Sequence, residues 1–456
     1  MSKKIHLIAI GGSAMHNMAL SLHEKGFNVS GSDDEINEPS KSRLEKAGIL
    51  PKEIGWFPEK LSSDIEAVIL GMHARADNPE LIRAHELGLR IYSYPEYIYE
   101  ATKDKIRIVV GGSHGKTTIT AMILHVLAQC KVDTDYMVGA QLAGFNTMVK
   151  LTNEAKIAVI EGDEYLASPI DRRPKFHLYH PNIAILSGIA WDHINVFPTF
   201  EMYVEQFSKF IDLIEPQGCL IYCENDEVLK KTAEESGKQN AIKKFPYGVP
   251  ANKIIDGVSY LLFNGKEYQL EIFGEHNLMN LNAARLACNQ VGISDEAFCN
   301  AIRSFKGAAK RLELVFKSAN FNFYKDFAHS PSKLKATTRS VKDQFTKRKL
   351  IACMELHTFS SLNETFLNEY KGSMDAADEA IVYFNPHTIA HKKLKEISID
   401  QVLKAFDRKD LKVFTQSNDL VNYLRSIHYE NKVLLMMSSG NFDGIDLTTL
   451  AKELSV

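Results

Sequence analysis

The sequence predicts an α/β protein of three domains, and three observations support this prediction. Short β-branched runs such as Ile5–Ile10 and Ile106–Val110 alternate with stretches of helical periodicity along the whole chain. At 456 residues the chain is too long for a single hydrophobic core. An apolar share of 45% with 24% charged residues allows each domain to bury a core of its own.

The first predicted domain, residues 1–103, is Rossmann-like. Its first strand, Ile5–Ile10, runs straight into Gly11-Gly12, and Asp33 follows a second strand at Asn28–Gly31. A glycine turn followed roughly twenty residues later by an acid resembles a dinucleotide-binding turn with an acidic residue that hydrogen-bonds the ribose. The glycine pattern is incomplete, so a plain tight turn explains these residues equally well.

The second and third predicted domains repeat the alternation of strands and helices. The central domain, residues 104–308, has predicted strands at Ile106–Val110, Ile157–Ile160, Ile183–Leu186 and Cys219–Tyr222, a hairpin at Asn252–Ile272 with an Asn264-Gly265 turn, and helices at Leu278–Val291 and Asp295–Ser304. The last domain, residues 309–456, has predicted strands at Phe321–Tyr324, Leu350–Met354, Ala380–Phe384 and Val433–Met437, and a helix near Asp419–His428.

The strongest chemical signal is a glycine-rich loop between a strand and an apolar helix. It consists of Gly112, Ser113, His114, Gly115, Lys116, Thr117 and Thr118. Glycines let backbone N–H groups point at phosphate oxygens, the lysine adds a charge, and the threonine hydroxyl suits Mg²⁺. The loop therefore predicts ATP binding, although it is one residue shorter than the common Walker A loop.

Two polar segments follow the next predicted strands. Glu161-Gly162-Asp163-Glu164 follows the strand Ile157–Ile160, and Asp192-His193 follows Ile183–Leu186. Ligands of α/β domains bind at the carboxyl ends of the strands, and carboxylate oxygens suit Mg²⁺. Alone, an acidic loop is more often only solvated and a single histidine is usually structural. Beside a phosphate loop, both segments become expected parts of one ATP and Mg²⁺ site.

Charge and targeting signals exclude several classes of protein. The formal net charge is −3 with acids and bases interspersed, so neither nucleic-acid nor membrane-surface binding is expected. No stretch approaches the roughly 20 apolar residues of a membrane span. Six scattered cysteines show no metal-type spacing and indicate reduced thiols of a cytoplasmic protein.

Taken together, these motifs resemble the Mur ligases, the ATP-dependent enzymes that build peptide stems on UDP-N-acetylmuramate. Further matching residues lie across the chain, at Gly274–Asn277, Asn280, Lys310–Glu313, Tyr324–Pro331 and Ser438–Phe442. Because the motifs occur in order over essentially the whole chain, the resemblance is specific. It implies three domains: an N-terminal UDP-binding domain, a central P-loop ATPase domain and a C-terminal acceptor-binding domain.

The resemblance also implies roles for individual residues. Lys116 and His193 would be catalytic, and Thr117, Glu161 and His193 would hold Mg²⁺. Residues 112–118, Asn277, Asn280, Arg311 and Asp326 would bind ATP. The UDP group would be bound by Gly11, Gly12, Ser13 and Asp33, and the acceptor by His329 and His357.

Several residues depart from the family pattern. Ala9, Ala14 and Asn17 stand where the turn usually has glycines, which affects the expected geometry of UDP binding. Other departures are Lys325, Ser330 and Asn195, and the segment Glu355–Ser361 lacks an arginine that would meet an acceptor carboxylate.

The expected reaction joins the lactyl carboxylate of UDP-N-acetylmuramate to the amine of a salvaged peptide, L-Ala-γ-D-Glu-diamino acid. The run Asp171–Phe176 after the acid loop favours this branch of the family, although an exposed charged loop is the plainer explanation of Arg172, Arg173 and Lys175. Three alternatives remain: free L-alanine as acceptor, a folate-type polyglutamating ligase, and a catalytically inactive sensor of UDP precursors. The sequence does not indicate the oligomeric state.

Overall fold

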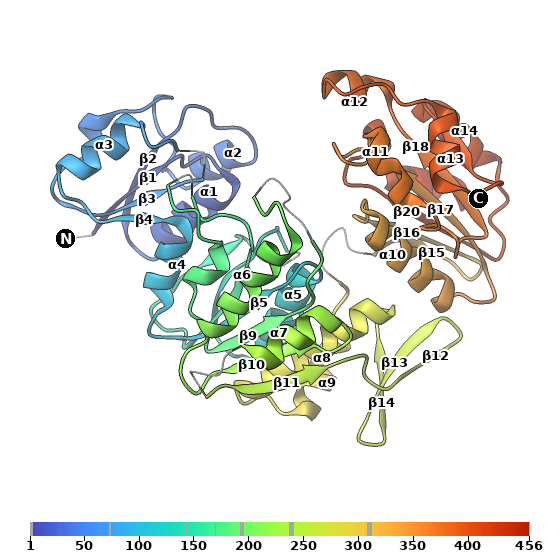
Figure 1. Ribbon diagram of the computed structural model, residues 1–456, viewed down its shortest axis with the longest axis horizontal. Coiled ribbons are helices and arrows are strands. Elements are labelled where there is room, and N and C mark those ends of the chain that lie inside the picture. The colour runs from blue at the N-terminus through green and yellow to red at the C-terminus, as the bar shows by residue number, and fades with distance from the viewer. Residues whose placement is uncertain are drawn as a thin grey trace. The chain divides into compact units, whose positions relative to one another are not determined.

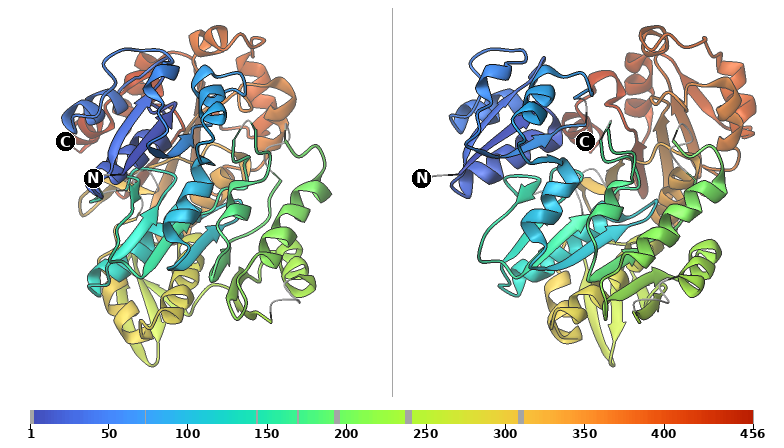
Figure 2. Two further views of the ribbon diagram at one scale, coloured as in Figure 1. Left: turned by 90° about the vertical axis from the view of Figure 1, so that its left-hand side faces the viewer. Right: turned by 60° about the vertical axis from the view of Figure 1, so that its left-hand side comes forward.

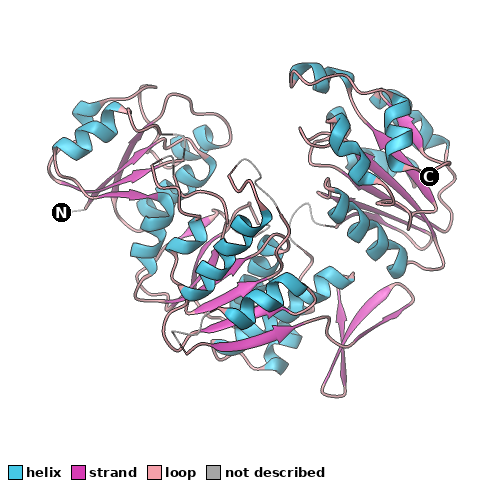
Figure 3. Cartoon of the chain, in the orientation of Figure 1, coloured by secondary structure: helices cyan, strands magenta, loops and turns pink. Residues whose placement is uncertain are grey.

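The computed structural model describes residues 3–72, 74–142, 144–168, 170–191, 196–236, 241–307 and 312–455. The chain forms two compact units, one of residues 1–249 and 279–302 and the other of residues 250–278 and 303–456. Helices and strands alternate along both units, as Figures 1 and 3 show. The predicted α/β class is therefore confirmed. The predicted domain boundaries at 103/104 and 308/309 stay predictions.

The chain opens with a four-stranded parallel sheet in the order β2-β1-β3-β4. Its elements are β1 Lys4–Ile8, α1 Ser13–Glu24, β2 Asn28–Ser32, α2 Ser40–Lys46, β3 Ile65–Leu70, α3 Pro79–Glu86 and β4 Ile91–Ser93. The strand order reverses between β1 and β3, which is the position where α/β sheets bind ligands. The first strand ends at Ile8 and not at Ile10 as predicted, because Ala9 adopts a left-handed conformation with φ of 67°.

Helix α4, Tyr94–Thr102, leads from this sheet to the next. Ser93 and Glu96 form a capping box at its start, and Pro95 lies in its first turn, where a missing N–H costs nothing. The helix is therefore well fixed at the end that borders the first sheet.

A seven-stranded sheet in the order β11-β10-β9-β5-β8-β6-β7 follows, parallel except for β7. Its strands are β5 Ile106–Gly111, β6 Thr134–Met137, β7 Val149–Lys150, β8 Ile157–Glu161, β9 Ile183–Leu186, β10 Cys219–Cys223 and β11 Lys243–Tyr247, and its helices are α5 Lys116–Gln129, α6 Phe200–Asp212, α7 Glu227–Glu235 and α9 Asp295–Ile302. Every residue of β8, β9 and β10 is buried, as expected of parallel strands covered on both faces. Figures 1 and 2 show helices on both sides of this sheet.

The second unit contains a small antiparallel sheet and a six-stranded sheet. The small sheet, in the order β12-β13-β14, comprises β12 Asn252–Ile255, β13 Val258–Phe263 and β14 Lys266–Leu270, with the predicted Asn264-Gly265 turn between the last two. Helix α8, Glu275–Gln290, has residues in both units.

The six-stranded sheet has the order β15-β16-β20-β17-β18-β19 and is parallel except for β15. Its strands are β15 Glu313–Lys317, β16 Phe321–Asp326, β17 Lys349–Glu355, β18 Glu379–Tyr383, β19 Lys412–Phe414 and β20 Lys432–Met437, and its helices are α10 Pro331–Gln344, α11 Glu364–Leu367, α12 Pro386–His391, α13 Ile399–Phe406, α14 Ser417–Ser426 and α15 Leu447–Leu454. Buried side chains form one core cluster on each face, such as Leu350 and Val433 in one and Ile351 and Leu434 in the other.

Within the described ranges, no helix is both long and apolar enough to cross a membrane. All six cysteines are free thiols, as predicted.

Candidate active site

Three loops of the first unit lie side by side because of the strand order. The central strand β5 pairs with β8 on one side and β9 on the other, and all three are parallel. The carboxyl ends of these strands therefore meet at one edge of the sheet. The loops that leave them begin at Gly112, Gly162 and Ser187, so the phosphate loop and the acid loop are direct neighbours.

The backbone of the phosphate loop requires glycine at two positions. Gly112 and Gly115 have φ values of 118° and 79°, which side chains rarely allow. An added Cβ would lie 2.3 Å from Ser187 Oγ at Gly112 and 2.4 Å from Asn280 Oδ1 at Gly115. Helix α5 begins directly after the loop, so its free N–H groups face the loop as a phosphate site needs.

Lys116 lies inside this loop and is held by an acid that follows β8. Its Nζ donates to Gly112 O at 2.7 Å and to Glu164 Oε2 at 2.8 Å. Burial lowers the pKa of Lys116, but the charge and hydrogen bond of Glu164, with the charges of Asp163 and Glu161, together raise it by more, so the net pKa is raised. Glu164 also accepts from the Tyr203 hydroxyl at 3.2 Å, and that hydroxyl lies 3.1 Å from Ser113 Oγ. The lysine is therefore charged and positioned.

Thr117 and Glu161 form the part of the site that could hold Mg²⁺. The Thr117 hydroxyl donates to Glu161 Oε1 at 2.9 Å, and the Gly139 N–H donates to Glu161 Oε2 at 2.9 Å. Burial raises the pKa of Glu161. In the part of the chain that the structure describes, no group of three or more His, Cys, Asp or Glu residues is arranged to hold a metal ion by itself. Two oxygen donors fit an ion that takes its remaining ligands from water and phosphate, as Mg²⁺ does.

Asp163 and Lys175 form a second ion pair in this region. Lys175 Nζ lies 2.6 Å from Asp163 Oδ2. Burial raises the pKa of Asp163, but the charge and hydrogen bond of Lys175, with the charge of Lys116 and the Tyr165 N–H, together lower it by more, so the net pKa is lowered. The three acids expected around Mg²⁺ thus have three different partners: Thr117 for Glu161, Lys175 for Asp163 and Lys116 for Glu164.

The turn after β1 and the phosphate loop border one cavity of about 450 Å³, the catalytic cleft. Gly12, Ser13 and Met15 line it from the N-terminal sheet, and Lys116 and Glu161 line it from the central sheet. Since all these residues belong to the first unit, the predicted UDP and ATP sites share one space.

The turn after β1 differs from a free phosphate-binding turn. The Gly11 N–H donates to Asp33 Oδ2 at 2.6 Å, so the acid predicted to read a ribose also holds the turn. An added Cβ at Gly11 would lie 2.9 Å from the carbonyl oxygen of Glu35. Burial raises the pKa of Asp33. Gly12 has space around it, because the nearest atom to an added Cβ would be 3.6 Å away.

The two asparagines predicted near ATP have different surroundings. Asn280 lies beside Gly115 of the phosphate loop, as the close Cβ approach shows. Asn277 donates to Phe273 O at 2.9 Å, within the second unit.

The predicted C-terminal residues lie at the carboxyl edge of the six-stranded sheet. Asp326 ends β16, and its carboxylate accepts from Leu312 N at 2.5 Å and Ala328 N at 2.7 Å. His329 follows, with Nδ1 2.8 Å from Phe327 O.

His357 follows β17, and its Nδ1 lies 3.4 Å from Glu355 Oε1. The other oxygen of Glu355 accepts from the Ser438 hydroxyl and from Phe442 N, within the Ser438–Phe442 motif. Since β20 lies between β16 and β17, His329 and His357 are on the same sheet edge but not on adjacent strands.

Three predicted site residues lie outside the described residues. They are His193, expected to be catalytic and to bind metal, its neighbour Asp192, expected at the same site, and Arg311, expected to bind ATP. Conversely, the prediction missed Tyr203 and Gly139 as contacts of the site, and it placed Glu164 beside Mg²⁺ and not against Lys116. Glu164 was visible as the last acid of its loop, whereas no sequence motif marks Tyr203 or Gly139.

Three family models match successive parts of the chain. They are described as the Mur ligase family, catalytic domain, at residues 4–106, the Mur ligase middle domain, at residues 110–288, and the Mur ligase, glutamate ligase domain, at residues 310–440.

Individual proteins are similar over most of their length. The UDP-N-acetylmuramate–L-alanine ligase of Clostridium kluyveri is 29% identical over 456 residues, covering 96% of both chains. The structure of a UDP-N-acetylmuramate:L-alanyl-γ-D-glutamyl-meso-diaminopimelate ligase from Neisseria meningitides is 27% identical with a TM-score of 0.59, over 68% of this chain and 100% of that one. The UDP-N-acetylmuramate–alanine ligase structure from Thermotoga maritima, at 21% identity and a TM-score of 0.68, covers 99% and 98% and shares the fold.

Proposed function

The chain belongs to the Mur ligase family, whose members are ATP-dependent amide ligases, and from this premise we propose a specific reaction for it. The reaction joins the lactyl carboxylate of UDP-N-acetylmuramate to the amine of a cell-wall peptide, L-Ala-γ-D-Glu-diamino acid. The observation that carries the proposal is that the phosphate loop and the turn after β1 border one cleft.

The chemistry begins with an unreactive carboxylate, which has no leaving group for an attacking amine. Transfer of the γ-phosphoryl group of ATP converts it to an acyl phosphate, and the amine then displaces phosphate. Most of the work is positioning and charge neutralisation. Lys116, charged and fixed by Glu164, would contact the phosphates, together with the N–H groups that begin α5.

Thr117 and Glu161 would hold Mg²⁺. Bound there, the ion would neutralise phosphate charge during transfer. The close Thr117–Glu161 contact supports this assignment, because it brings a hydroxyl and a buried carboxylate together beside the phosphate loop. His193 is proposed as a further ligand from the family resemblance alone.

The UDP end of the substrate would lie against Gly12 and Ser13 at the start of α1. Gly11 and Asp33 would shape this turn through their mutual hydrogen bond, and any contact of Asp33 with UDP would use its second oxygen. Arg311, Asn277, Asn280 and Asp326 remain proposed ATP contacts. The acceptor would be bound by His329 and His357, and the cytoplasm is the proposed location.

Two acceptors have specific support. The peptide is favoured by the Asp171–Phe176 run, since Lys175 of that run reaches Asp163 beside the phosphate loop. Free L-alanine is favoured by the sequence relatives, which are named UDP-N-acetylmuramate–L-alanine ligases and match this chain over nearly their whole length.

An acceptor screen separates these possibilities. Phosphate release would be measured with ATP, Mg²⁺ and UDP-N-acetylmuramate fixed, and with tripeptide, L-alanine, glutamate or no acceptor added. We expect kcat/KM for the tripeptide to exceed that for L-alanine by about 100-fold or more, because a cognate acceptor uses contacts that a fragment lacks. The reverse preference assigns the L-alanine reaction. No phosphate release with any acceptor, together with tight binding of UDP-N-acetylmuramate, assigns a catalytically inactive sensor.

A further inference from the structure

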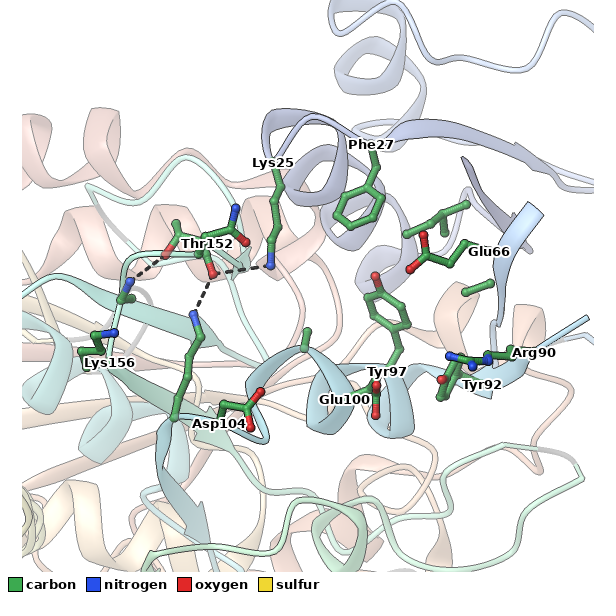
Figure 4. Close-up of a pocket in the computed structure, with 16 residues that line it drawn as sticks. Lys25, Phe27, Glu66, Arg90, Tyr92, Tyr97, Glu100, Asp104, Thr152 and Lys156 are labelled. Carbon is green, nitrogen blue, oxygen red and sulfur yellow. Dashed lines mark hydrogen bonds between the residues drawn. The ribbon is translucent and has the colours of Figure 1, made fainter. Parts of the chain in front are cut away.

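The first unit has a second cavity, the rear pocket, at the opposite end of the N-terminal strands from the catalytic cleft. Its volume is about 360 Å³, and Ile5 at the start of β1 lines it, whereas Ala9 beyond the other end of β1 lines the cleft. Figure 4 shows side chains from α4 and from the segment around Thr152 facing this space. The volume is within the range of small-molecule sites.

Aromatic side chains form part of the wall. Phe27, Tyr92 and Tyr97 line the pocket, and the rings of Tyr92 and Tyr97 meet edge to face at 5.7 Å. Tyr97 is only 8% exposed, and its side chain ends in a hydroxyl group. Figure 4 shows this hydroxyl pointing toward the space between Phe27 and Glu66. A ligand inside the pocket would therefore meet both aromatic faces and a hydroxyl group.

Most acids of the lining already have cationic partners. Glu66 pairs with Lys3 at 2.7 Å, and Glu100 pairs with Lys103 at 2.8 Å. Neither of these lysines lines the pocket. The negative charges of Glu66 and Glu100 are therefore already balanced by lysines outside the pocket, and little of them is left to balance the cations that line it.

The cations of the lining are less well balanced. Lys105 pairs with Asp135 at 2.5 Å and also donates to Thr152 O at 2.7 Å. Among the described residues, Lys25 donates only to that same carbonyl, at 3.4 Å, and is half-buried. Burial in the first place, and Lys105 in the second, lower the pKa of Lys25.

Two further cations, Arg90 and Lys156, also line the pocket without an ion pair within the described ranges. Three lining cations, Lys25, Arg90 and Lys156, have no ion pair within the described ranges. Only one lining acid, Asp104, has no ion pair within the same ranges. The pocket therefore has an excess of positive charge, aromatic walls and one tyrosine hydroxyl in its lining.

We propose that the rear pocket binds a small organic anion, a carboxylate or phosphate compound with an apolar body. The anionic group would contact Lys25 and Arg90, and the apolar body would lie against Phe27 and Tyr97. The Tyr97 hydroxyl would hydrogen-bond to the ligand. Helix α4 contributes Tyr94 to the catalytic cleft and Tyr97 to the rear pocket, so the two sites are close but separate.

Calorimetric titration of the full chain with four probes of similar size tests this proposal. Benzoate and phenyl phosphate supply the two anions, and benzyl alcohol and benzylamine are the neutral and cationic counterparts. Excess ADP keeps phenyl phosphate out of the phosphate loop. We expect at least one anion to bind about tenfold or more tightly than the neutral and cationic probes. A preference between benzoate and phenyl phosphate assigns the anionic group.

Variants then locate the binding. Lys25→Gln and Arg90→Gln should each weaken anion binding about tenfold, and Tyr97→Phe, which removes one oxygen atom, should weaken it severalfold. Lys52→Gln removes an exposed lysine that lines no part of the pocket and should change nothing. The proposal is overturned if neither anion binds, if all four probes bind equally, or if Lys52→Gln weakens binding as much as Arg90→Gln.

Discussion

The two glycine turns of the first unit occupy equivalent places in their sheets but are held in different ways. Each follows the first strand of a parallel sheet and leads into a helix, α1 or α5. In the turn after β1, the Gly11 N–H is already bound by Asp33. In the phosphate loop the acid Glu164 contacts the Lys116 ammonium, and the N–H groups that begin α5 face the loop.

The two turns also differ in their backbone conformations. The phosphate loop places glycines at its positive φ values, whereas the turn after β1 places Ala9 at a φ of 67°. A side chain in that conformation is strained, so surrounding contacts must fix the turn. This difference shows that a strand, a glycine turn and a helix together create a place that suits an anion but do not by themselves supply chemistry there. In the proposed function, the lysine and its acidic partner would make one of the two turns a phosphoryl-transfer site.

The largest expected effect is that of Lys116→Ala. Removing the ammonium should lower ligase kcat by roughly 10³-fold, because no other charge at the loop replaces it. Phosphate release with saturating ATP and UDP-N-acetylmuramate measures it. Lys131→Ala, at an exposed lysine just past the other end of α5, is the matched control. Full activity of Lys116→Ala would remove the distinction between the two turns.

Glu161→Gln should have the next largest effect. The amide can still accept from the Gly139 N–H, but it lacks the charge that attracts Mg²⁺, so the Mg²⁺ concentration for half-maximal rate should rise about 10- to 100-fold. A Mg²⁺ titration of the rate measures this shift. Glu154→Gln, at an exposed acid before β8, should leave the titration unchanged. An identical Mg²⁺ dependence for both variants would argue against a metal site at Glu161.

Gly11→Ala and Gly12→Ala test how the turn after β1 is held. At Gly11 the new Cβ would lie 2.9 Å from Glu35 O, a backbone atom that cannot easily move, so we expect a loss of about 1–3 kcal/mol in stability. At Gly12 the nearest atom is 3.6 Å away, and the change should stay within about 0.5 kcal/mol. Urea unfolding measures both. Equal losses would mean that the Asp33 contact does not fix this turn.

The smallest expected effect concerns His16, which lies beneath the turn after β1. Its Nδ1 is 3.0 Å from Gly12 O, and its Nε2 is 3.1 Å from Arg43 Nη1, an arrangement that requires a neutral ring. Burial first, and Arg43 after it, lower the pKa of His16. The unfolded chain then binds a proton more readily, so stability falls as pH drops below about 6.5.

Thermal unfolding of the wild type and His16→Gln between pH 7.5 and 5.5 measures this effect. We expect the wild type to lose at most a few degrees more in Tm than the variant over this range. A larger loss in the variant would contradict the neutral state of His16. The phosphate loop should keep its ATP affinity over the same range, because its lysine stays protonated.

Much of the fold was predictable because its signals are local. The strands β8, β9, β10, β17 and β20 are continuous apolar runs, and the Asn264-Gly265 turn is a short-range hairpin signal. The strands β6, β11, β15 and β19 were not predicted, because they are short or carry polar residues. The predicted end of the first strand was wrong for a different reason. Ala9 adopts a conformation that its sequence neighbours do not favour.

The sequence by itself determined the phosphate loop, because a strand, seven contiguous loop residues and a helix start are enough to specify it. Only the tertiary structure decided which partner each charge has. Glu164 is 48 residues from Lys116, and Lys175 is 12 residues from Asp163. Lys175 reaches Asp163 because the segment between β8 and β9 folds back on itself, with a bridge between Leu166 and Pro174. Glu164 meets Lys116 because β8 lies beside β5, and a strand order set by the packing of both sheet faces is not encoded in any local pattern.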